Sequence, residues 1–419
     1  MTPPPEQTQP HPAGSRTYLL AGTVLTDGMT LDNAAVVVAD GRIAYVGPRA
    51  GLDESALPGA EELDLPAGSM ILPGLVDLHC HGAAGGEFPS GDSQAARTAV
   101  DFLHRSGTTT LLASLVTAER ADLLHALGTL RPLADSGLIA GIHSEGPFLS
   151  HARCGAQDPR FLQEPDVELL GELIEAGGGH LRTMTYAPEL PGADAVVRLL
   201  AARGVTPSLG HTDADARTTA ASLTHAAEQL AASGQATVSR PTVTHLFNGM
   251  PPLHHRSPGP VAACLRLAEA GTAAVELIAD GAHLDPETVR MVFALVGAEN
   301  VVLVTDSMAA TGLPDGDYEL GPQSVSVSGA VARLQSTGAL AGGTATLLDV
   351  VRRTIKAGVD PAAAVRSATA VPAAIIGRQQ DIGSLRAGLR ADVVVVDSDF
   401  RRVLVLRGGR TLGRPAVGL

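Results

Sequence analysis

Side chains that can bind a metal ion recur in this 419-residue chain, each directly after a short apolar run. Such runs are typical of buried strands, so these side chains are expected at strand ends. They are His79 and His81, Glu145, His211, His245, Asp280 and His283, and Asp306. Neutral imidazole and carboxylate are the usual ligands of a divalent ion that activates water. The pattern therefore predicts a metal-dependent hydrolytic centre.

The first of these segments, LVDLHCH, holds two histidines separated by one residue. Because side chains alternate along a strand, His79 and His81 are expected to point to the same side. Cys80 then points to the other side. This spacing places both imidazoles at one strand end, where further ligands can join them.

Three later segments can supply the three protein ligands of a catalytic metal centre. We expect these ligands to be Glu145, His211 and His245. Asp306 follows the last apolar run and is placed to take a proton from metal-activated water. Each residue alone has a plainer interpretation, since a lone histidine is usually a satisfied polar residue and Asp306 can cap a helix. The repetition at strand ends is what favours a metal site.

Residues at several strand ends meet only if the fold gathers those ends. Between residues 73 and 382, about eight apolar runs alternate with segments of helical spacing, which predicts a (β/α)8 TIM-like barrel. The active sites of such barrels lie at the carboxyl ends of the strands. No GxGxxG motif follows the first strand, which argues against a doubly wound dinucleotide-binding sheet.

Both ends of the chain are rich in short β segments bounded by Gly and Asp. We expect residues 17–72 and 383–419 to pair as a small β-sandwich domain beside the barrel. Residues 1–16 are rich in Pro and Gln and are expected to form a disordered tail rather than a signal peptide. No apolar stretch approaches the ~20 residues of a membrane span. The protein is predicted to be cytoplasmic.

Composition excludes several classes of function. A formal net charge of −14 argues against a general nucleic-acid binder, and an aromatic share of 3% argues against a base-stacking surface. The lack of a long apolar stretch argues against a membrane partner. The three cysteines, Cys80, Cys154 and Cys264, lie far apart without CxxC spacing. They indicate a reducing compartment rather than a disulfide framework.

Longer motifs identify a family resemblance. They include PGLVDLHCHGAAGGEF, HSEGPFL, LGHTDA, THLFNGMPPLHHRSPG, IADGAHLD and LVTDSM. In this order, across nearly the whole chain, they resemble the N-acetylglucosamine-6-phosphate deacetylases of the amidohydrolase superfamily. The resemblance implies hydrolysis of the acetamide of an N-acetyl amino-sugar phosphate.

The resemblance also implies a metal arrangement. One divalent ion is expected on Glu145, His211 and His245, with a second on His79 and His81. Zinc is the first expectation, and iron, manganese or cobalt can take its place. The only lysine, Lys356, lies beyond the last barrel strand, so a carbamylated lysine cannot bridge two metals and Glu145 is the carboxylate left to do so.

For the substrate, the resemblance implies five residues. Asp306 acts as general base and then general acid, and His283 helps to hold the sugar. Asn248 and Gly249 contact the same substrate. Arg256 is expected to bind the phosphate, in its own subunit or across the interface of a homodimer.

One position departs from the family pattern. Gln157 stands where the family usually has a histidine that touches the sugar, and it can hydrogen-bond but cannot be charged. A related substrate such as N-acetylgalactosamine 6-phosphate is therefore an alternative. Two other interpretations are a deaminase or acylamino-acid hydrolase on the same scaffold and a catalytically silent protein that binds a sugar phosphate.

Overall fold

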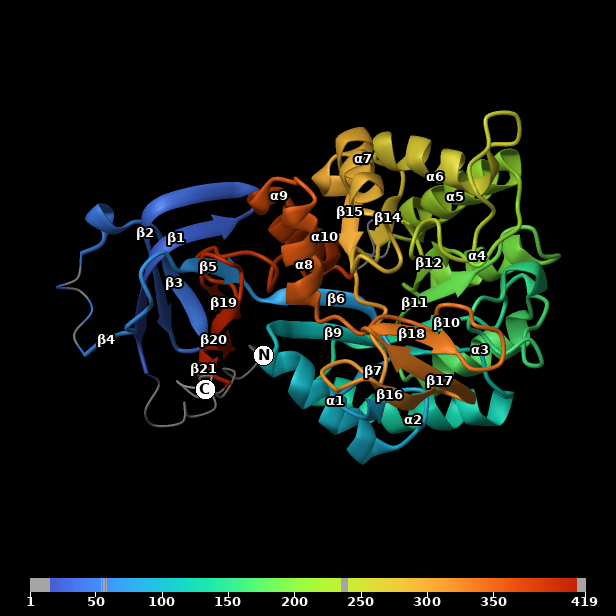
Figure 1. The fold of residues 1–419 in the computed structure, drawn as a ribbon, viewed down its shortest axis with the longest axis horizontal. Helices are drawn as coiled ribbons and strands as arrows, with labels where there is room; N and C mark the ends of the chain where they lie inside the picture. Colours follow the sequence, from blue (N-terminus) through green and yellow to red (C-terminus); the bar gives the residue numbers. More distant parts are fainter. Residues whose placement is uncertain (1–15, 54, 56, 58, 235–239, 413–419) are drawn as a thin grey trace, which may run out of the picture.

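A barrel of parallel strands dominates the computed structural model, which describes residues 16–53, 55, 57, 59–234 and 240–412 (Figure 1). Eight strands lie in chain order around it, each paired with the next in parallel. They are β6 (Leu75–Cys80), β9 (Thr108–Leu115), β10 (Gly141–Glu145), β11 (Leu181–Tyr186), β12 (Thr206–Leu209), β13 (Thr242–Val243), β14 (Ala274–Leu277) and β15 (Val301–Leu303). The predicted TIM-like barrel is confirmed.

Helices cover the outside of the barrel. They are α1 (Ser93–Arg105), α2 (Arg120–Asp135), α3 (Val167–Ala176), α4 (Ala193–Ala202), α5 (Ala216–Ser233), α6 (Gly259–Glu269), α7 (Pro286–Val296), α8 (Leu347–Lys356), α9 (Pro361–Ser367) and α10 (Ala370–Ile375). Short 3₁₀ turns are η1 (Arg49–Gly51), η3 (His151–Arg153) and η4 (Ala298–Asn300). Aspartate side chains cap several helices by accepting backbone N–H groups of the first turn, as Asp92 does for α1 and Asp285 for α7.

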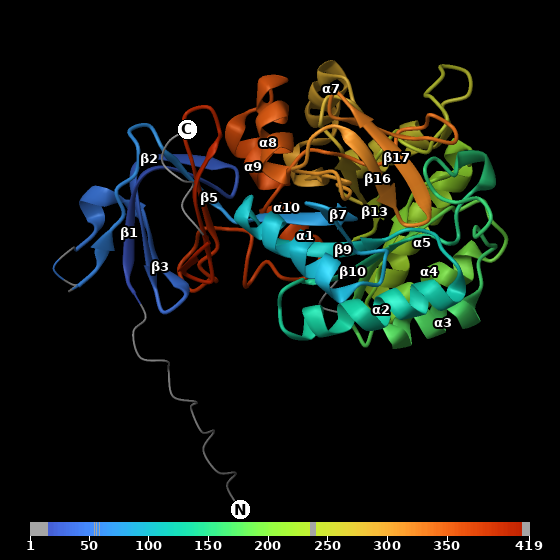
Figure 2. The same ribbon diagram turned by 60° about the horizontal axis from the view of Figure 1, so that its bottom comes forward.

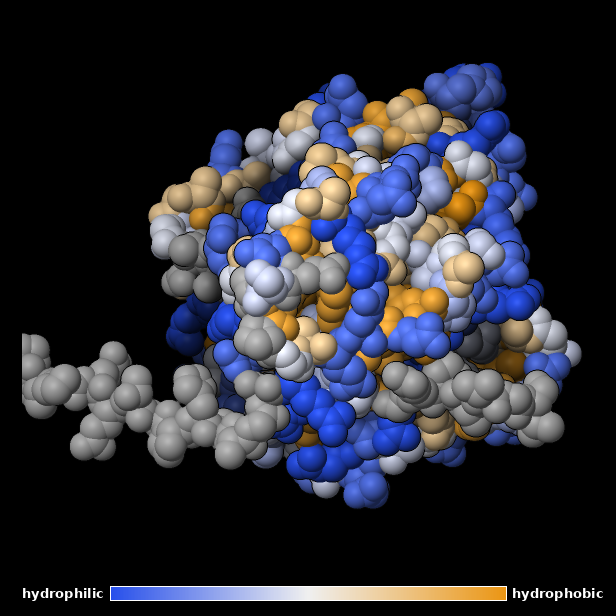
Figure 3. Space-filling view, turned by 90° about the vertical axis from the view of Figure 1, so that its left-hand side faces the viewer, coloured by the Kyte–Doolittle hydropathy of each residue, from blue (hydrophilic) through white to orange (hydrophobic). Residues whose placement is uncertain are grey.

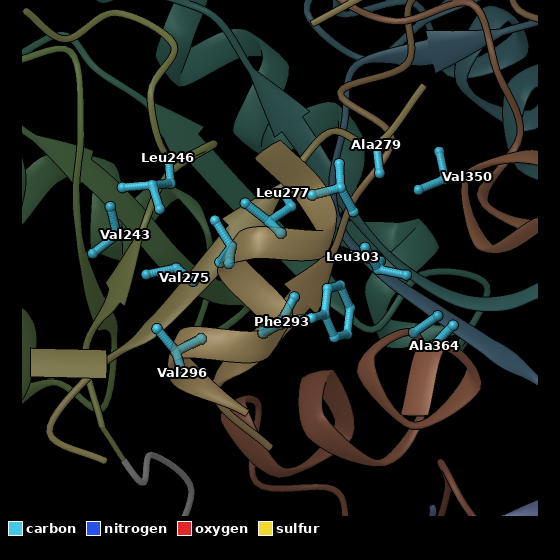
Figure 4. Packing of buried hydrophobic residues seen from close by; sticks show 14 of the residues in the cluster. Val243, Leu246, Val275, Leu277, Ala279, Phe293, Val296, Leu303, Val350 and Ala364 are labelled. Atoms are coloured by element: carbon cyan, nitrogen blue, oxygen red, sulfur yellow. The ribbon is translucent and has the colours of Figure 1, made fainter. Parts of the chain in front are cut away.

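Apolar side chains fill the space between strands and helices. Figure 4 shows Leu277 of β14 and Leu303 of β15 beside Phe293 and Val296 of α7, with Ala364 of α9 nearby. These residues are buried, which explains why the strands have almost continuous apolar sequences. The packing fixes the strand ends from which the polar residues project.

The barrel closes between its first and last strands through a buried aspartate. Asp77 on β6 accepts a hydrogen bond of 2.7 Å from the Thr305 hydroxyl, and the Asp306 N–H donates to the His79 carbonyl oxygen at 2.8 Å. Burial raises the pKa of Asp77 to about 7. The closure therefore brings His79 next to Asp306, although the two residues are 227 positions apart in the sequence.

A second sheet joins the two ends of the chain, as predicted. Its strands are β1 (Tyr18–Thr26), β2 (Met29–Ala39), β3 (Arg42–Pro48), β4 (Glu61–Glu62), β5 (Met70–Pro73), β19 (Val393–Val396), β20 (Arg402–Arg407) and β21 (Arg410–Thr411). The sheet curls until Ile43 N of β3 bonds the Leu389 carbonyl at 2.9 Å, so strands from both ends share one apolar core. Its outer face is largely hydrophilic, with apolar areas between (Figure 3).

The numerical domain limits, 17–72, 73–382 and 383–419, stay predictions. The proposed tail of residues 1–16 lies outside the described residues, apart from Arg16. Among the described residues, no helix is both long enough and apolar enough to cross a membrane.

An insertion after β15 was not foreseen from the sequence. It forms a three-stranded antiparallel sheet of β16 (Gly316–Leu320), β17 (Gln323–Ser328) and β18 (Val331–Leu334), which lies against the barrel (Figure 2). Near it is a short hairpin of β7 (Gly82–Ala83) and β8 (Gly86–Glu87). Leu320 of this insertion packs with Val116 and Met308, so the insertion forms one wall above the strand ends.

Candidate active site

Three metal-binding side chains meet at the ends of β10, β12 and β13. Glu145 Oε1 lies 2.9 Å from His211 Nε2 and 2.8 Å from His245 Nε2, and all three residues are buried. Both histidines have positive φ angles, 46° and 28°, which turn the chain sharply after each strand. The tight fit extends to Gly249, where an added Cβ would lie 2.9 Å from His211 Nδ1.

A second group shares the same glutamate. His79 and His81 of the first segment lie with Nε2 atoms 3.1 Å apart, and His81 Nε2 is 3.2 Å from Glu145 Oε2. Asp306 completes the group, with Oδ1 3.1 Å from His81 Nε2 and 3.4 Å from His79 Nε2. In each group the candidate ligand atoms all lie within 4.8 Å of one another.

Hydrogen bonds on the far side of the rings hold the imidazoles in place. His211 Nδ1 lies 2.8 Å from the Arg153 carbonyl, and His81 Nδ1 lies 3.2 Å from the Ser114 carbonyl. A carbonyl only accepts, so these Nδ1 atoms carry the hydrogen and each Nε2 turns its lone pair inward. Nε2 lone pairs and carboxylate oxygens thus converge on two points, which is the donor set of a divalent cation. The residues fit the predicted metal centre.

Charge balance within the groups favours ionised carboxylates. Burial alone would raise the pKa of Glu145, but His79, His211 and His245 outweigh it and hold that pKa well below its usual value. Asp306 behaves in the same way beside His79 and His81, and its pKa is lowered. An ionised Asp306 is in the state that a general base requires.

The histidines respond in the opposite sense. Burial lowers the pKa of His79, but Asp306 and Glu145 hold it well above its usual value. Hydrogen bonds to the same two carboxylates outweigh burial at His81 and raise its pKa to about 9. Without a cation, the carboxylates therefore attract protons to the rings that would bind it.

His283 belongs to a separate polar pair beside these groups. Its Nδ1 lies 2.9 Å from Asp280 Oδ2, while Asp280 Oδ1 accepts the backbone N–H groups of Ala282 and His283. Burial lowers the pKa of His283, but the hydrogen bond and charge of Asp280 raise it overall. His283 also lines the cavity described next, where a bound molecule can meet it.

A cavity of about 210 Å³ opens onto both metal-binding groups. Its lining includes the polar residues His283, Asn248 and Gln157, the backbone of Gly249, and the apolar residues Leu320, Ala339 and Leu340. From the two metal-binding groups, the cavity is lined by His81, Glu145, His211, His245 and Asp306. The cavity can therefore hold a small polar molecule with one apolar group.

Comparison with known proteins agrees with this geometry. The model of the amidohydrolase family matches residues 70–412. An N-acetylglucosamine-6-phosphate deacetylase of Bacillus subtilis (strain 168) is 34% identical over 397 residues, which cover 92% of this chain and 94% of the relative. The chain belongs to the N-acetylglucosamine-6-phosphate deacetylase family of amidohydrolases.

Two further deacetylases are similar to this chain. An N-acetylgalactosamine-6-phosphate deacetylase of Escherichia coli O157:H7 is 33% identical and covers 91% of this chain and 95% of the relative. A variant deacetylase of Mycobacterium smegmatis, solved in complex with N-acetyl-D-glucosamine-6-phosphate, superposes with a TM-score of 0.84 at 36% identity. That match covers 96% of this chain and all of the other.

Most of the predicted residues of this deacetylase-family member lie together, and Arg256 is the exception. Its side chain is exposed, its Nη1 lies 2.9 Å from His255 Nε2, and it does not line the described cavity. Gln157 does line the cavity, but it also hydrogen-bonds Glu145. Lys356 ends α8 and is exposed, so it does not reach either metal-binding group.

Glu276 is a site residue that the sequence analysis missed. It lies on β14, is 1% exposed, and places Oε2 3.2 Å from His79 Nδ1 and 3.2 Å from the His245 N–H. It therefore orients the second group and supports the backbone of the first. The available signal was the one carboxylate inside the apolar run AVELIA, where burial without a partner is costly.

Proposed function

We propose that this protein hydrolyses the N-acetyl group of N-acetylglucosamine 6-phosphate to give glucosamine 6-phosphate and acetate. The observation that carries the proposal is the convergence of Glu145, His211 and His245 on one point, with Asp306 across the same cavity. Family membership directs this hydrolytic centre to an N-acetyl amide. A divalent ion on Glu145, His211 and His245, with zinc the first expectation, would acidify water and polarise the acetyl carbonyl.

Asp306 moves the proton in the proposed reaction. The carboxylate takes a proton from the attacking water as the water oxygen bonds to the acetyl carbon. It then gives that proton to the sugar nitrogen as the C–N bond breaks, so the amine leaves as a neutral group. The lowered pKa of Asp306 keeps the carboxylate ionised before the first step, and its position beside the cavity allows both steps.

The remaining residues of the cavity suit a sugar. His283, Asn248 and Gly249 supply polar groups to the lining, and His283 is fixed by Asp280. Arg256 suits a phosphate because a guanidinium forms paired hydrogen bonds with it. Since Arg256 does not line the cavity of its own chain, we propose that it serves the cavity of a neighbouring copy in a homodimer. A cytoplasmic location stays a prediction.

The test is acetate release from three purified substrates. N-acetylglucosamine 6-phosphate is expected to react fastest, the galactosamine epimer more slowly, and unphosphorylated N-acetylglucosamine least. Faster release from the epimer would make this protein an N-acetylgalactosamine-6-phosphate deacetylase, which the E. coli O157:H7 relative makes the second candidate. No release from any of them by the metal-loaded protein would contradict the proposal and favour a silent sugar-phosphate binder.

The role of Arg256 needs a separate experiment. Arg256→Ala is expected to raise KM for the phosphorylated substrate and to leave the slow reaction of the unphosphorylated sugar unchanged. Arg240 offers a matched control, because it bonds Asn300 and the Glu299 carbonyl away from the cavity. An equal loss for both substrates in Arg256→Ala would refute phosphate binding by this residue.

A further inference from the structure

Gln157 is held on both sides of its amide by the protein itself. It is 4% exposed, its Oε1 accepts the Thr117 N–H at 2.7 Å, and its Nε2 donates to Glu145 Oε2 at 2.6 Å. The orientation of the amide is unambiguous, because a backbone N–H only donates and must face the oxygen. The amide N–H is therefore directed at the glutamate.

Thr117 anchors this arrangement at a second point. Its hydroxyl donates to the Glu145 carbonyl at 3.2 Å, while its N–H holds Gln157. The adjacent Gly146 has φ +90°, and an added Cβ there would lie 2.2 Å from Thr117 Oγ1. Glycine thus permits the close approach. Thr117 fixes the backbone of Glu145 through its hydroxyl and the side chain of Gln157 through its N–H.

The two oxygens of Glu145 face different histidines. Oε1 lies against His211 and His245, whereas Oε2 lies 3.2 Å from His81 and 3.6 Å from His79. Gln157 bonds only Oε2. It therefore acts on the oxygen that belongs to the His79/His81 group.

We propose that Gln157 is a positioning residue that sets the orientation of the Glu145 carboxylate, so that one oxygen serves each cation site. The inference rests on the metal centre of the proposed function. Its main effect falls on the site formed by His79, His81, Glu145 and Asp306, called here the second site. The site formed by Glu145, His211 and His245, called here the first site, uses the other oxygen and depends less on Gln157.

The test measures Zn²⁺ binding to metal-free protein in competition with a chromophoric chelator. Gln157→Met keeps much of the side-chain volume and removes both hydrogen bonds. We expect the second-site affinity to fall about 10–100-fold, the range found for residues that orient metal ligands. Repeating the measurement in a His81→Ala background, which leaves only the first site, should show a change below about threefold.

Gln163→Ala is the matched control, since this half-buried glutamine lies on the same loop and, among the described residues, bonds Pro147 through its backbone N–H. It should bind two Zn²⁺ ions as the unmodified protein does. Thermal unfolding of each metal-free variant checks that the fold is kept. Thr117→Ala, which retains the N–H to Gln157, is expected to weaken the second site less than Gln157→Met does.

Three results would overturn the inference: equal weakening of both sites, no weakening of either, or a single Zn²⁺ site in the unmodified protein. A rise in KM with unchanged metal binding in Gln157→Met would show instead that Gln157 contacts the substrate. Because the readout is metal affinity, it is independent of acetate release. The inference on Gln157 can hold if the proposed deacetylation fails, and it can fail if the deacetylation is found.

Discussion

The two cation sites share Glu145 but are built in different ways. The first site takes one residue from each of three strand ends, and two of its ligands have left-handed backbone angles. The second site takes two residues from one strand by simple alternation and adds Asp306 across the barrel closure. The first site thus depends on left-handed turns at two of its three ligands, whereas the second depends on closure of the barrel and on one such turn, at Asp306 (φ 49°).

The sites also differ in the groups that face the Nδ1 atoms of their histidines. His79 of the second site meets a buried carboxylate, Glu276, and His81 meets a carbonyl. In the first site His211 meets a carbonyl, while His245 Nδ1 has no hydrogen-bond partner among the described residues. The second site therefore carries more negative charge and holds protons more tightly when it is empty. Two sites that share one carboxylate can therefore differ in how strongly protons compete with the cation for their histidines.

Asp306→Asn is expected to have the largest effect. The amide cannot accept the proton, so turnover should fall about 10²–10⁴-fold. Zn²⁺ in the first site should stay bound, because Asp306 is not one of its ligands. Acetate release together with metal analysis checks this. Near-normal turnover in the metal-loaded variant would refute the role of Asp306 in proton transfer.

Single histidine substitutions should separate the sites. His211→Ala removes a first-site ligand, and His81→Ala removes a second-site ligand. If the unmodified protein binds two Zn²⁺ ions, each variant is expected to bind one, with the lower activity in His211→Ala. Metal content after equilibrium dialysis gives the answer. If one substitution empties both sites, the two sites are not independent.

Proton competition should make the second site the more pH-dependent. Its histidines have raised pKa values, about 9 at His81, and they must lose their protons to bind metal. Affinity should therefore rise with pH up to about 9, by about tenfold per pH unit for each proton displaced. Chelator competition in His81→Ala and His211→Ala compares the slopes. A steeper slope for the first site would contradict this view.

The smallest effect, on stability, is expected at His104, which lies on α1 and far from the site. Burial, with Arg407 and Arg390 nearby, lowers its pKa to about 3, whereas an unfolded histidine titrates near 6.5. The stability it contributes is present above pH 6.5 and is lost as pH falls toward 3. In metal-free protein the site histidines have the opposite sign, since raised pKa values give stability that is lost as pH rises.

Thermal unfolding of metal-free His104→Gln tests this. Compared with the unmodified protein, its unfolding temperature should fall less between pH 6.5 and pH 4, because glutamine does not titrate. His180→Gln is a matched control, since His180 is partly exposed and lies 2.7 Å from Asp135 Oδ1 at the surface. The same pH dependence in both variants would show that burial of His104 is not the cause.

The sequence predicted the fold well because its signals are local. Alternation of apolar runs and helical segments indicated the barrel, and β-rich ends indicated the small sheet. The insertion of β16, β17 and β18 was missed, since its alternating strands, such as QSVSVS, are short and only half buried. Glu276 was missed because its partners, His79 on β6 and His245 after β13, come from other parts of the barrel.

Residue types and their order along the chain determined the chemistry of this protein: imidazoles and carboxylates at strand ends, and no lysine to bridge metals. Which of them share an ion was decided only by the tertiary structure. Closure of the barrel brought Asp306 to His81, and the hydrogen bond from Gln157 aimed one oxygen of Glu145 at the second site. The reason is physical, because a side chain's identity is fixed by the chain, while its direction depends on the groups that pack around it.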